Sequence, residues 1–449
     1  MTTDSSVYLA AVEGGGTTFV VSIACIIKND SKDENNSTIN IGSNRLKLLH
    51  TATIPKRDEV TGEIPNNYTP KQILDEACSF FREHMPPNNG HYSALGIATF
   101  GPAGVDPNSK LYGTILSGSP KKQWRGVDIL SPIREACGLV GEQFDKRVAF
   151  ETDVNAPAMA EFRHRCHLQR QQSTNDSNDT KALTSLSYVT IGTGVGVGLV
   201  LNSQPLHGLL HPEGGHICIQ PLQGDKFSGY SWGAKSPYKG IGTVEGMASS
   251  VALTERLIQM ENEGNIIVDD ANKTDGNYKN GDNAQTREVL STLPDNHPVW
   301  LHASNAIANL CVSILLLTSC QTIVLGGGIM KREILYPMIR SRVWTLLNGY
   351  LDSVEELSEE SKLEEVIVKS SWQEVGSGLV GAFALALDAY DRDVDVEETE
   401  DVSRGDKKKE ELLTDNEQRV YTYGVLVGIG LSFASTIMMS LFTRSPPRR

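Results

Sequence analysis

Hydrophobic residues in the first hundred positions fall into short runs separated by polar or glycine-rich segments. Apolar runs of strand length occupy residues 8–12, 19–27, 46–54 and 93–99. A glycine-rich turn, 13–18, joins the first two runs, whereas 70–82 repeats its apolar positions at helical spacing. The order strand, turn, strand, strand, helix, strand predicts an α/β domain, with the polar segment 28–43 as a surface insertion.

The strand, glycine turn and strand recur in the second half of the chain. Residues 187–191 and 199–201 are apolar and flank a second glycine-rich turn, 192–198. This likeness indicates a weak internal repeat. The pattern then predicts a helix at 300–318, a strand at 322–325 and a last helix at 378–390, with polar loops at 169–181 and 269–285.

These elements divide the chain into an N-terminal domain over residues 7–155 and a C-terminal domain over 156–390, with the last helix packing back on the first domain. Residues 391–419 mix both signs of charge and predict a solvated linker. Residues 420–442 contain no charged residue and are long enough to cross a bilayer. They predict one C-terminal transmembrane helix, with a buried core helix as the alternative.

Composition narrows the function classes. The chain has 449 residues, 39% of them hydrophobic and 21% charged, which is typical of globular proteins. Its net charge of −14 disfavours nucleic acid as a partner, while a small anion such as ATP can still be bound by local backbone N–H groups. The seven cysteines are scattered without a C-x-x-C pair, which indicates a reducing compartment. No targeting pattern marks the N-terminal residues, so we expect no cleaved signal.

Three glycine clusters follow predicted strands. The first two could bind phosphate through their backbone N–H groups, and the third could pack flat against an adenine or a ribose. Their residues are Gly14, Gly15, Gly16, Thr17 and Thr18; Gly192, Thr193, Gly194 and Gly196; and Gly326, Gly327 and Gly328. A simple hairpin or strand-to-helix turn is the alternative for each cluster. The chain has no P-loop motif, and the second cluster lacks the Rossmann spacing, so both of those nucleotide sites are excluded. The pattern favours a nucleotide held between two turns in a cleft between domains.

Polar side chains with acid–base chemistry follow another predicted strand. Asp153 comes just after the apolar residues 148–150, at the edge of the sheet where ligands gather. It could act as a general base on a sugar hydroxyl, and a helix N-cap is the alternative. Glu213, His216 and Glu245 offer carboxylate and imidazole groups suited to binding vicinal hydroxyls.

The ordered motifs of the chain resemble those of the ROK sugar kinases, specifically their fructokinase branch. The matching segments are Glu13-Gly14-Gly15-Gly16-Thr17, Phe100-Gly101-Pro102, Thr152-Asp153-Val154-Asn155-Ala156, Gly192 to Gly198, His211-Pro212-Glu213 with Gly215-His216, Glu245-Gly246, and Gly326-Gly327-Gly328. The resemblance implies an actin-like (hexokinase/ASKHA) fold, with two domains and an interdomain cleft. It also implies ATP and Mg²⁺ as cofactors, and transfer of the γ-phosphate to a hexose 6-hydroxyl.

The resemblance further assigns roles to individual residues. It implies Asp153 as the catalytic base, with Thr152, Asn155, Glu213, His216 and Glu245 in the sugar site and the three glycine clusters around the nucleotide. D-fructose is the first expectation, and a mannose, glucose or N-acylhexosamine kinase is the alternative. A non-catalytic, membrane-tethered sugar sensor is the alternative from another class, while the acidic chain without a DNA-binding helical domain disfavours a repressor.

One departure concerns a structural zinc site that the family usually carries. Ser236, Lys239 and Gly242 stand where its Cys-Pro-Tyr-His-x-x-Cys segment has ligands, which leaves His216 alone. One histidine cannot hold tetrahedral zinc, so we expect no protein-bound metal and a sugar-side loop held by packing.

The C-terminal segment sets the expected location. Free cysteines and the need for ATP favour a kinase domain on the cytosolic side of the membrane. The predicted span is only moderately apolar, and a basic tail with Arg444, Arg448 and Arg449 follows it. These features favour an organelle outer membrane, mitochondrial or plastid. A homodimer is left open.

Overall fold

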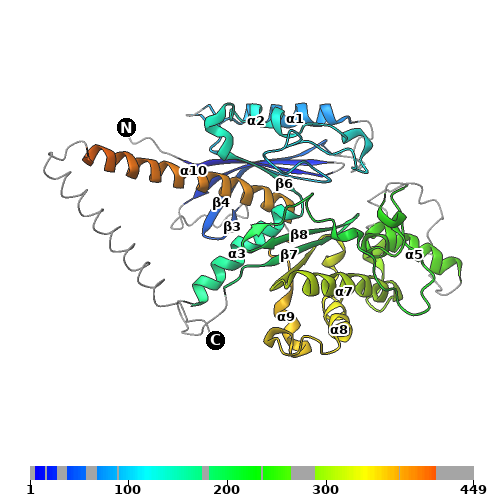
Figure 1. The fold of residues 1–449 in the computed structure, drawn as a ribbon. Helices are drawn as coiled ribbons and strands as arrows, with labels where there is room; N and C mark the ends of the chain where they lie inside the picture. Colours follow the sequence, from blue (N-terminus) through cyan, green and yellow to red (C-terminus); the bar gives the residue numbers. More distant parts are fainter. Residues whose placement is uncertain are drawn as a thin grey trace, which may run out of the picture. The chain divides into compact units, whose positions relative to one another are not determined.

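Two β-sheets organise the part of the chain up to Tyr390, and helices cover both faces of each (Figure 1). The computed structural model describes residues 6–15, 18–27, 38–56, 68–87, 90–173, 182–233, 236–263, 289–373 and 375–410. Contacts divide the chain into one unit ending at Tyr390 and a second beginning at Asp391.

The first sheet has the strand order β3-β4-β2-β1-β5-β6. Its strands are β1 (Tyr8–Gly14), β2 (Phe19–Ile27), β3 (Thr38–Ile41), β4 (Asn44–Ile54), β5 (Ala94–Thr99) and β6 (Val148–Thr152). Strands β1 and β2 form an antiparallel hairpin, while β5 runs parallel to both β1 and β6. The ends of β1, β5 and β6 therefore meet at one edge of the sheet.

The second sheet repeats this plan with the order β11-β10-β7-β8-β9. Its strands are β7 (Leu186–Ile191), β8 (Val195–Leu201), β9 (Gln204–Pro205), β10 (Thr322–Gly326) and β11 (Ile367–Lys369). Strands β7 and β8 form the hairpin, and β10 runs parallel to β7. A glycine turn closes the hairpin in both sheets, so the repeat expected from the sequence is present in the topology.

Nine α-helices supply the outer layers. They are α1 (Pro70–Glu83), α2 (Leu130–Ala136), α3 (Asn155–Ser173), α4 (Val244–Ala248), α5 (Ser250–Asn262), α7 (Pro298–Thr318), α8 (Leu335–Leu347), α9 (Leu363–Val366) and α10 (Ser377–Glu410), counted over the described residues. Helix α1 begins where expected, because Pro70 takes its first turn and Thr69 forms a reciprocal capping box with Gln72.

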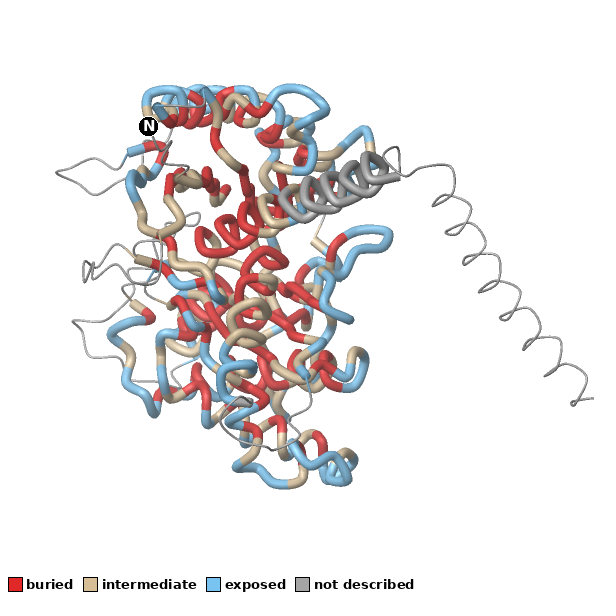
Figure 2. Tube along the Cα trace, turned by 90° about the vertical axis from the view of Figure 1, so that its left-hand side faces the viewer, coloured by how far each residue is buried: buried red, intermediate tan, exposed pale blue. Residues whose placement is uncertain are grey.

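Separate apolar cores lie on the two faces of each sheet, and buried positions run through both layers (Figure 2). In the first sheet, α1 and α2 cover one face and α10 covers the other. In the second sheet, α3 lies on one face, while α4, α5, α7 and α8 bury the other. We call these two layered halves the first and second lobes.

The first part of helix α10, up to Tyr390, packs against the first lobe. Ala382, Phe383 and Ala386 are fully buried against this sheet. A side chain on Gly96 of β5 would collide with the carbonyl oxygen of Ala382, so glycine is needed for this close approach. The helix continues to Glu410, whereas the sequence pattern predicts its end at 390. Glutamate and lysine are good helix formers, and this charged segment is rich in them.

Two strand boundaries also differ from the sequence-based expectations. Residues 38–41 form strand β3, although they lie in the polar segment expected to be a surface insertion. Their alternation of buried and exposed residues is too short to stand out beside the asparagine-rich stretch before it. Strand β8 begins at Val195, so Gly196 and Gly198 belong to the strand rather than to the turn.

The predicted membrane anchor, 420–442, lies outside the described residues. Within the described part of the chain, one helix is long and apolar enough to cross a membrane, namely α7. About two thirds (67%) of its most apolar window is buried inside the second lobe, as in the core helix of a globular domain.

Candidate active site

The carboxyl edge of the first sheet holds the predicted base. Gly14, Thr99 and Thr152 lie side by side in register across β1, β5 and β6. Asp153 follows β6 immediately, and its backbone N–H donates to the carbonyl of Thr99 over 2.8 Å. Burial raises the pKa of the Asp153 carboxyl to about 6, against the opposing effect of its own backbone N–H. A carboxylate with this pKa is suited to accept a proton near neutral pH.

Glu13 stands beside this base, and the sequence analysis did not single it out as a site residue. Its carboxylate accepts a hydrogen bond from the backbone N–H of Leu379, in the first turn of α10. Burial, followed by repulsion from Asp153, raises the pKa of Glu13 to about 7. An acidic residue at the end of an apolar strand, just before a glycine turn, was the signal that could have found it.

The second lobe brings Glu213, His216 and Glu245 together as predicted. The Nε2 atom of His216 lies 3.7 Å from Glu213 Oε2, and its Nδ1 atom lies 4.0 Å from Glu245 Oε1. Glu213 and His216 flank the short 3₁₀ turn Gly214–His216, whereas Glu245 lies on α4. The imidazole therefore sits between two carboxylates, an arrangement rich in acceptors for sugar hydroxyls.

Electrostatics connect this trio to the base on the first lobe. Burial first, and then the charges of Glu245 and Asp153, raise the pKa of Glu213 to about 7. Burial also raises the pKa of Glu245, although the N–H of Val195, His216 and Trp232 act in the opposite direction. Electrostatic contacts thus link four carboxylates of the two lobes in sequence, from Glu13 through Asp153 and Glu213 to Glu245, a concentration typical of functional sites.

Trp232 is a second residue that the sequence analysis missed. Its side chain hydrogen-bonds to Glu245 and lies edge-on to Tyr230, with ring centroids 5.2 Å apart. No short motif marks this tryptophan, because its contact with Glu245 is made across a loop.

Thr152 and Asn155, predicted for the sugar site, have side chains engaged within the protein. The Thr152 hydroxyl accepts a hydrogen bond from the N–H of Asn155. The Asn155 side chain accepts from the N–H of Leu199 on β8 and donates to Glu151 on β6. Both residues are buried. In this structure they join the two lobes behind the site.

The predicted phosphate turns occupy matching places at the two sheet edges. The N–H of Gly15 donates to the carbonyl of Thr18 and closes the first turn, while Gly16 and Thr17 lie outside the described residues. In the second turn the N–H of Gly192 donates to the carbonyl of Gly194. Thr193 lies between them. Gly326 ends the neighbouring strand β10, and Gly327 and Gly328 follow it. Gly196 instead packs against Val154 from within β8.

These turns fit a nucleotide phosphate chain. Open space adjoins Gly192 and Gly328, where a side chain would meet no atom within 4 Å. In the first lobe the buried Thr99 hydroxyl has no hydrogen-bond partner among the described residues. Magnesium in kinases is held by phosphate oxygens and one or two carboxylates, and Glu13 and Asp153 are the carboxylates beside the first turn.

The residues at the expected zinc positions do not fit that metal. Ser236, Lys239 and Gly242 supply neither a thiolate nor an imidazole. Within the described ranges, no cluster of three or more His, Cys, Asp or Glu side chains is placed to hold a metal ion. The loop that begins at Ile217 and ends at Thr243 (the sugar-side loop) therefore needs another attachment.

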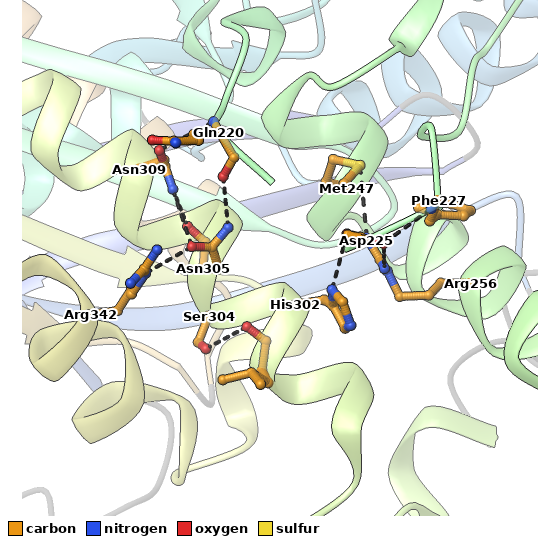
Figure 3. Close-up of polar contacts among 11 residues, drawn as sticks. Gln220, Asp225, Phe227, Met247, Arg256, His302, Ser304, Asn305, Asn309 and Arg342 are labelled. Carbon is orange, nitrogen blue, oxygen red and sulfur yellow. Dashed lines mark hydrogen bonds and ion pairs between the residues drawn. The ribbon is translucent and has the colours of Figure 1, made fainter. Parts of the chain in front are cut away.

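A buried ion pair supplies that attachment (Figure 3). Asp225 of the sugar-side loop receives two hydrogen bonds, of 2.7 and 2.9 Å, from the guanidinium of Arg256 on α5. His302 on α7 contacts the same carboxylate at 3.1 Å. Burial acts to raise the pKa of Asp225, but hydrogen bonds from Arg256 and the N–H of Phe227 outweigh it and lower the pKa.

The same loop has a second polar attachment, visible in Figure 3. Asn305 on α7 donates to the carbonyl of Gln220, and its side-chain oxygen accepts from Arg342 on α8. The middle of the loop contacts the site, since the N–H of Tyr230 donates to the carbonyl of Gly246, next to Glu245. Helices α5, α7 and α8 thus support the loop that carries Trp232.

Comparisons with known proteins show the family of the chain. A family model described as the ROK family matches residues 38–389. A fructokinase of Zymomonas mobilis subsp. mobilis is 28% identical over 393 residues, which cover 87% of this chain and 100% of that protein. A putative fructokinase of Bacillus subtilis is 30% identical over 322 residues, covering 71% of this chain and 85% of that protein.

A solved structure shares the fold. The ROK family glucokinase from Streptomyces griseus, in complex with glucose and AMPPNP, aligns with a TM-score of 0.53 at 19% sequence identity. The alignment covers 85% of this chain and 99% of the glucokinase. The actin-like architecture of two domains expected from the sequence is therefore confirmed.

The buried ion pair makes the stability of the second lobe depend on Asp225 rather than on a metal. Replacing Asp225→Asn leaves the Arg256 guanidinium buried without a counter-charge, so we expect a loss of about 3–5 kcal/mol of unfolding free energy. Asp75→Asn, in an exposed pair with Lys71, is the matched control and should change stability by less than about 0.5 kcal/mol. Urea unfolding measures both variants. A chelator such as EDTA should leave the melting temperature of the parent protein unchanged, and a chelator-induced fall would contradict this assignment.

Crowding of carboxylates predicts an unusual dependence of stability on pH. Because the pKa of Glu213 is higher in the folded protein than in the unfolded chain, the folded state holds the extra proton, and its stability falls as pH rises from about 4.5 to about 7. Glu213→Gln removes this effect, so the ligand-free variant should melt at a higher temperature than the parent at pH 8 and at a similar one at pH 4.5. Exposed Glu83→Gln serves as the control. Equal melting temperatures at pH 8 would show that the pKa of Glu213 is not raised in the folded protein.

Proposed function

The chain belongs to the ROK family, and from that premise we propose that it transfers the γ-phosphate of ATP to a hexose, with D-fructose as the preferred substrate. The sugar-kinase class is supported by named fructokinases that match nearly the whole folded part of the chain. The observation that carries the proposal is the Asp153 carboxylate just after β6, whose pKa is raised to about 6 and whose charge acts on Glu213 from the opposite lobe.

In the proposed reaction, Asp153 accepts the proton of the attacking sugar hydroxyl. The hydroxyl oxygen forms a bond to the γ-phosphorus as the bond to the bridging oxygen of ADP breaks, so one proton passes to Asp153 and ADP leaves. Phosphoryl transfer needs mainly positioning and charge neutralisation. Glu213, His216 and Glu245 hold the other hydroxyls and fix the sugar's orientation.

The nucleotide side is assigned to the glycine turns. Backbone N–H groups around Gly14–Gly16 and Gly192–Gly194 would bind phosphate oxygens, with Gly326–Gly328 beside the adenosine. Magnesium would be held by Glu13 with the phosphates and would neutralise their charge when bound. Because Glu13 already repels Asp153, a cation at this point also favours the ionised, proton-accepting form of Asp153.

Fructose rests on the fructokinase relatives, and a mannose, glucose or N-acylhexosamine kinase is the alternative. A coupled ADP-release assay over these hexoses should give the largest kcat/KM with fructose. In the same assay Asp153→Asn should lower kcat by about 10²–10⁴-fold, because it keeps the shape of the side chain but removes the base. Its melting temperature should not fall, since a neutral amide is easier to bury. Turnover of Asp153→Asn close to that of the parent would exclude Asp153 as the base, and the absence of ADP release with every hexose would favour the non-catalytic sensor.

We also propose that residues 420–442 anchor the kinase to an organelle outer membrane with its catalytic part in the cytosol. The support is the uncharged stretch itself, its length and the basic tail that follows. Cell fractionation tests this proposal: the full chain should pellet with organelles and lose its kinase part to added protease. A chain ending at Arg419 should remain in the supernatant and keep its activity. A truncated chain that still pellets would contradict the anchor.

A further inference from the structure

A segment of the second lobe reaches across to the first lobe beside the proposed base. Residues 206–213, which we call the strap, lead from β9 to Glu213. Its two histidines, His207 and His211, contact residues of the first lobe, and neither belongs to the proposed sugar-binding residues. The strap is anchored behind by a hydrogen bond from the N–H of Leu206 to the carbonyl of Leu199 on β8.

His207 makes the first contact. Its Nε2 atom lies 2.5 Å from Glu151 Oε2, and the exposed fractions of the two side chains are 36% and 5%. A carboxylate only accepts hydrogen bonds, so this nitrogen carries the proton. The other Glu151 oxygen accepts from the N–H of Thr152 and from the side chain of Asn155. Glu151 therefore connects the strap to the backbone that presents Asp153.

His211 makes the second contact in the opposite sense. Its buried Nε2 atom accepts a hydrogen bond of 3.3 Å from the N–H of Ala103, in the turn after β5. Its Nδ1 atom lies 3.3 Å from the carbonyl of Pro212 and 3.7 Å from Glu213 Oε1. This pattern fixes a neutral imidazole with the proton on Nδ1, and burial lowers the pKa of His211 accordingly.

We propose that the strap is a two-point clasp in which His207 and His211, as positioning residues, set the place of Glu213 relative to Asp153 and so determine the affinity for the sugar. The proposal rests on the function proposed above. His211 is the fixed point, because it is buried and neutral. His207 is the adjustable point, because it is partly exposed and its bond to Glu151 strengthens when the imidazole is charged.

The groups facing His207 come from three elements. Glu151 on β6 raises the pKa of His207 through its hydrogen bond, burial lowers it, and Asp106 in the loop after β5 raises it. His211 is the neighbouring titratable group on the strap itself. The clasp is therefore strongest below the raised pKa of His207 and weakens as pH increases through it.

Steady-state kinetics of the full chain test the clasp through two substrates. His207→Ala should raise the KM for the sugar about ten-fold, the effect of losing one charge-assisted hydrogen bond. The KM for ATP should not change, because the strap does not carry the glycine turns. His207→Gln, whose amide can still donate to Glu151, should restore part of the affinity. His91→Gln, a partly exposed histidine of the first lobe, is the matched control. An equal rise in both KM values, or no rise in either, would overturn the clasp.

Two further measurements separate the clasp from a general loss of structure. Glu151→Gln should raise the sugar KM in the parent but should add little in the His207→Ala variant, because both changes remove the same contact between His207 and Glu151. The ratio of sugar KM in His207→Gln to that in the parent should decline toward one as pH rises, and a ratio independent of pH would contradict the adjustable point. Failure of the proposed function would appear separately, as an inactive parent or an active Asp153→Asn variant.

Discussion

The joint between the end of β6 and the middle of β8 is the contact on which the rest of the site depends. Asn155 bonds to β8 through the N–H of Leu199 and to β6 through Glu151, and it is completely buried. Gly198 is required opposite it, because a side chain there would collide with the carbonyl oxygen of Val154. A buried polar side chain whose oxygen and nitrogen both have partners favours one geometry, since any other would leave these groups unpaired. These bonds fix the position of the second sheet relative to the first, next to Asp153, although the two sheets share no strand.

That joint makes possible a concentration of charge that a single lobe would not hold. Glu13 and Asp153 come from the first sheet, and Glu213 and Glu245 from the second lobe. Their mutual repulsion is a cost to the folded state, which the surrounding cores offset. Burial, with this repulsion as a smaller cause at Glu13 and Glu213, raises the pKa values of Glu13, Asp153 and Glu213 to between about 6 and about 7, where proton transfer is effective. Stability and chemistry are thus opposed within one group of side chains.

Much of this arrangement could be predicted from local patterns. The strands before the glycine turns, helix α7 and the position of Asp153 follow from apolar runs and from the residues that end them. Strand β3 was missed because it has only four residues, two of them polar, and directly follows a polar, asparagine-rich stretch. The sequence assigns no role to Glu13, because its neighbours Asp153 and Leu379 lie far from it along the chain.

Other parts of the site depend on contacts that no local pattern carries. The Asp225–Arg256 pair joins residues from a loop and a helix, and nothing near Asp225 marks it as buried. The same holds for His207, whose partner Glu151 lies on a strand of the other lobe. Thr152 and Asn155 were placed in the sugar site by resemblance, yet their bonds run inside the protein. Sequence patterns locate reactive groups better than the polar contacts that orient them.

The return of α10 to the first sheet also governs the order in which the protein can be made. During synthesis the first lobe emerges early, but the cover of one of its apolar faces, including Phe383 and Ala386, emerges only after the whole second lobe. Until then Leu9 and Ala11 of β1, buried in the finished protein, have no helix over them. Exposed apolar sheet is a target for chaperones and for aggregation. The two lobes are therefore separate in architecture, but the first lobe cannot be completed until the second has been synthesised. A chain that ends between the two lobes would have one apolar face of its first sheet uncovered.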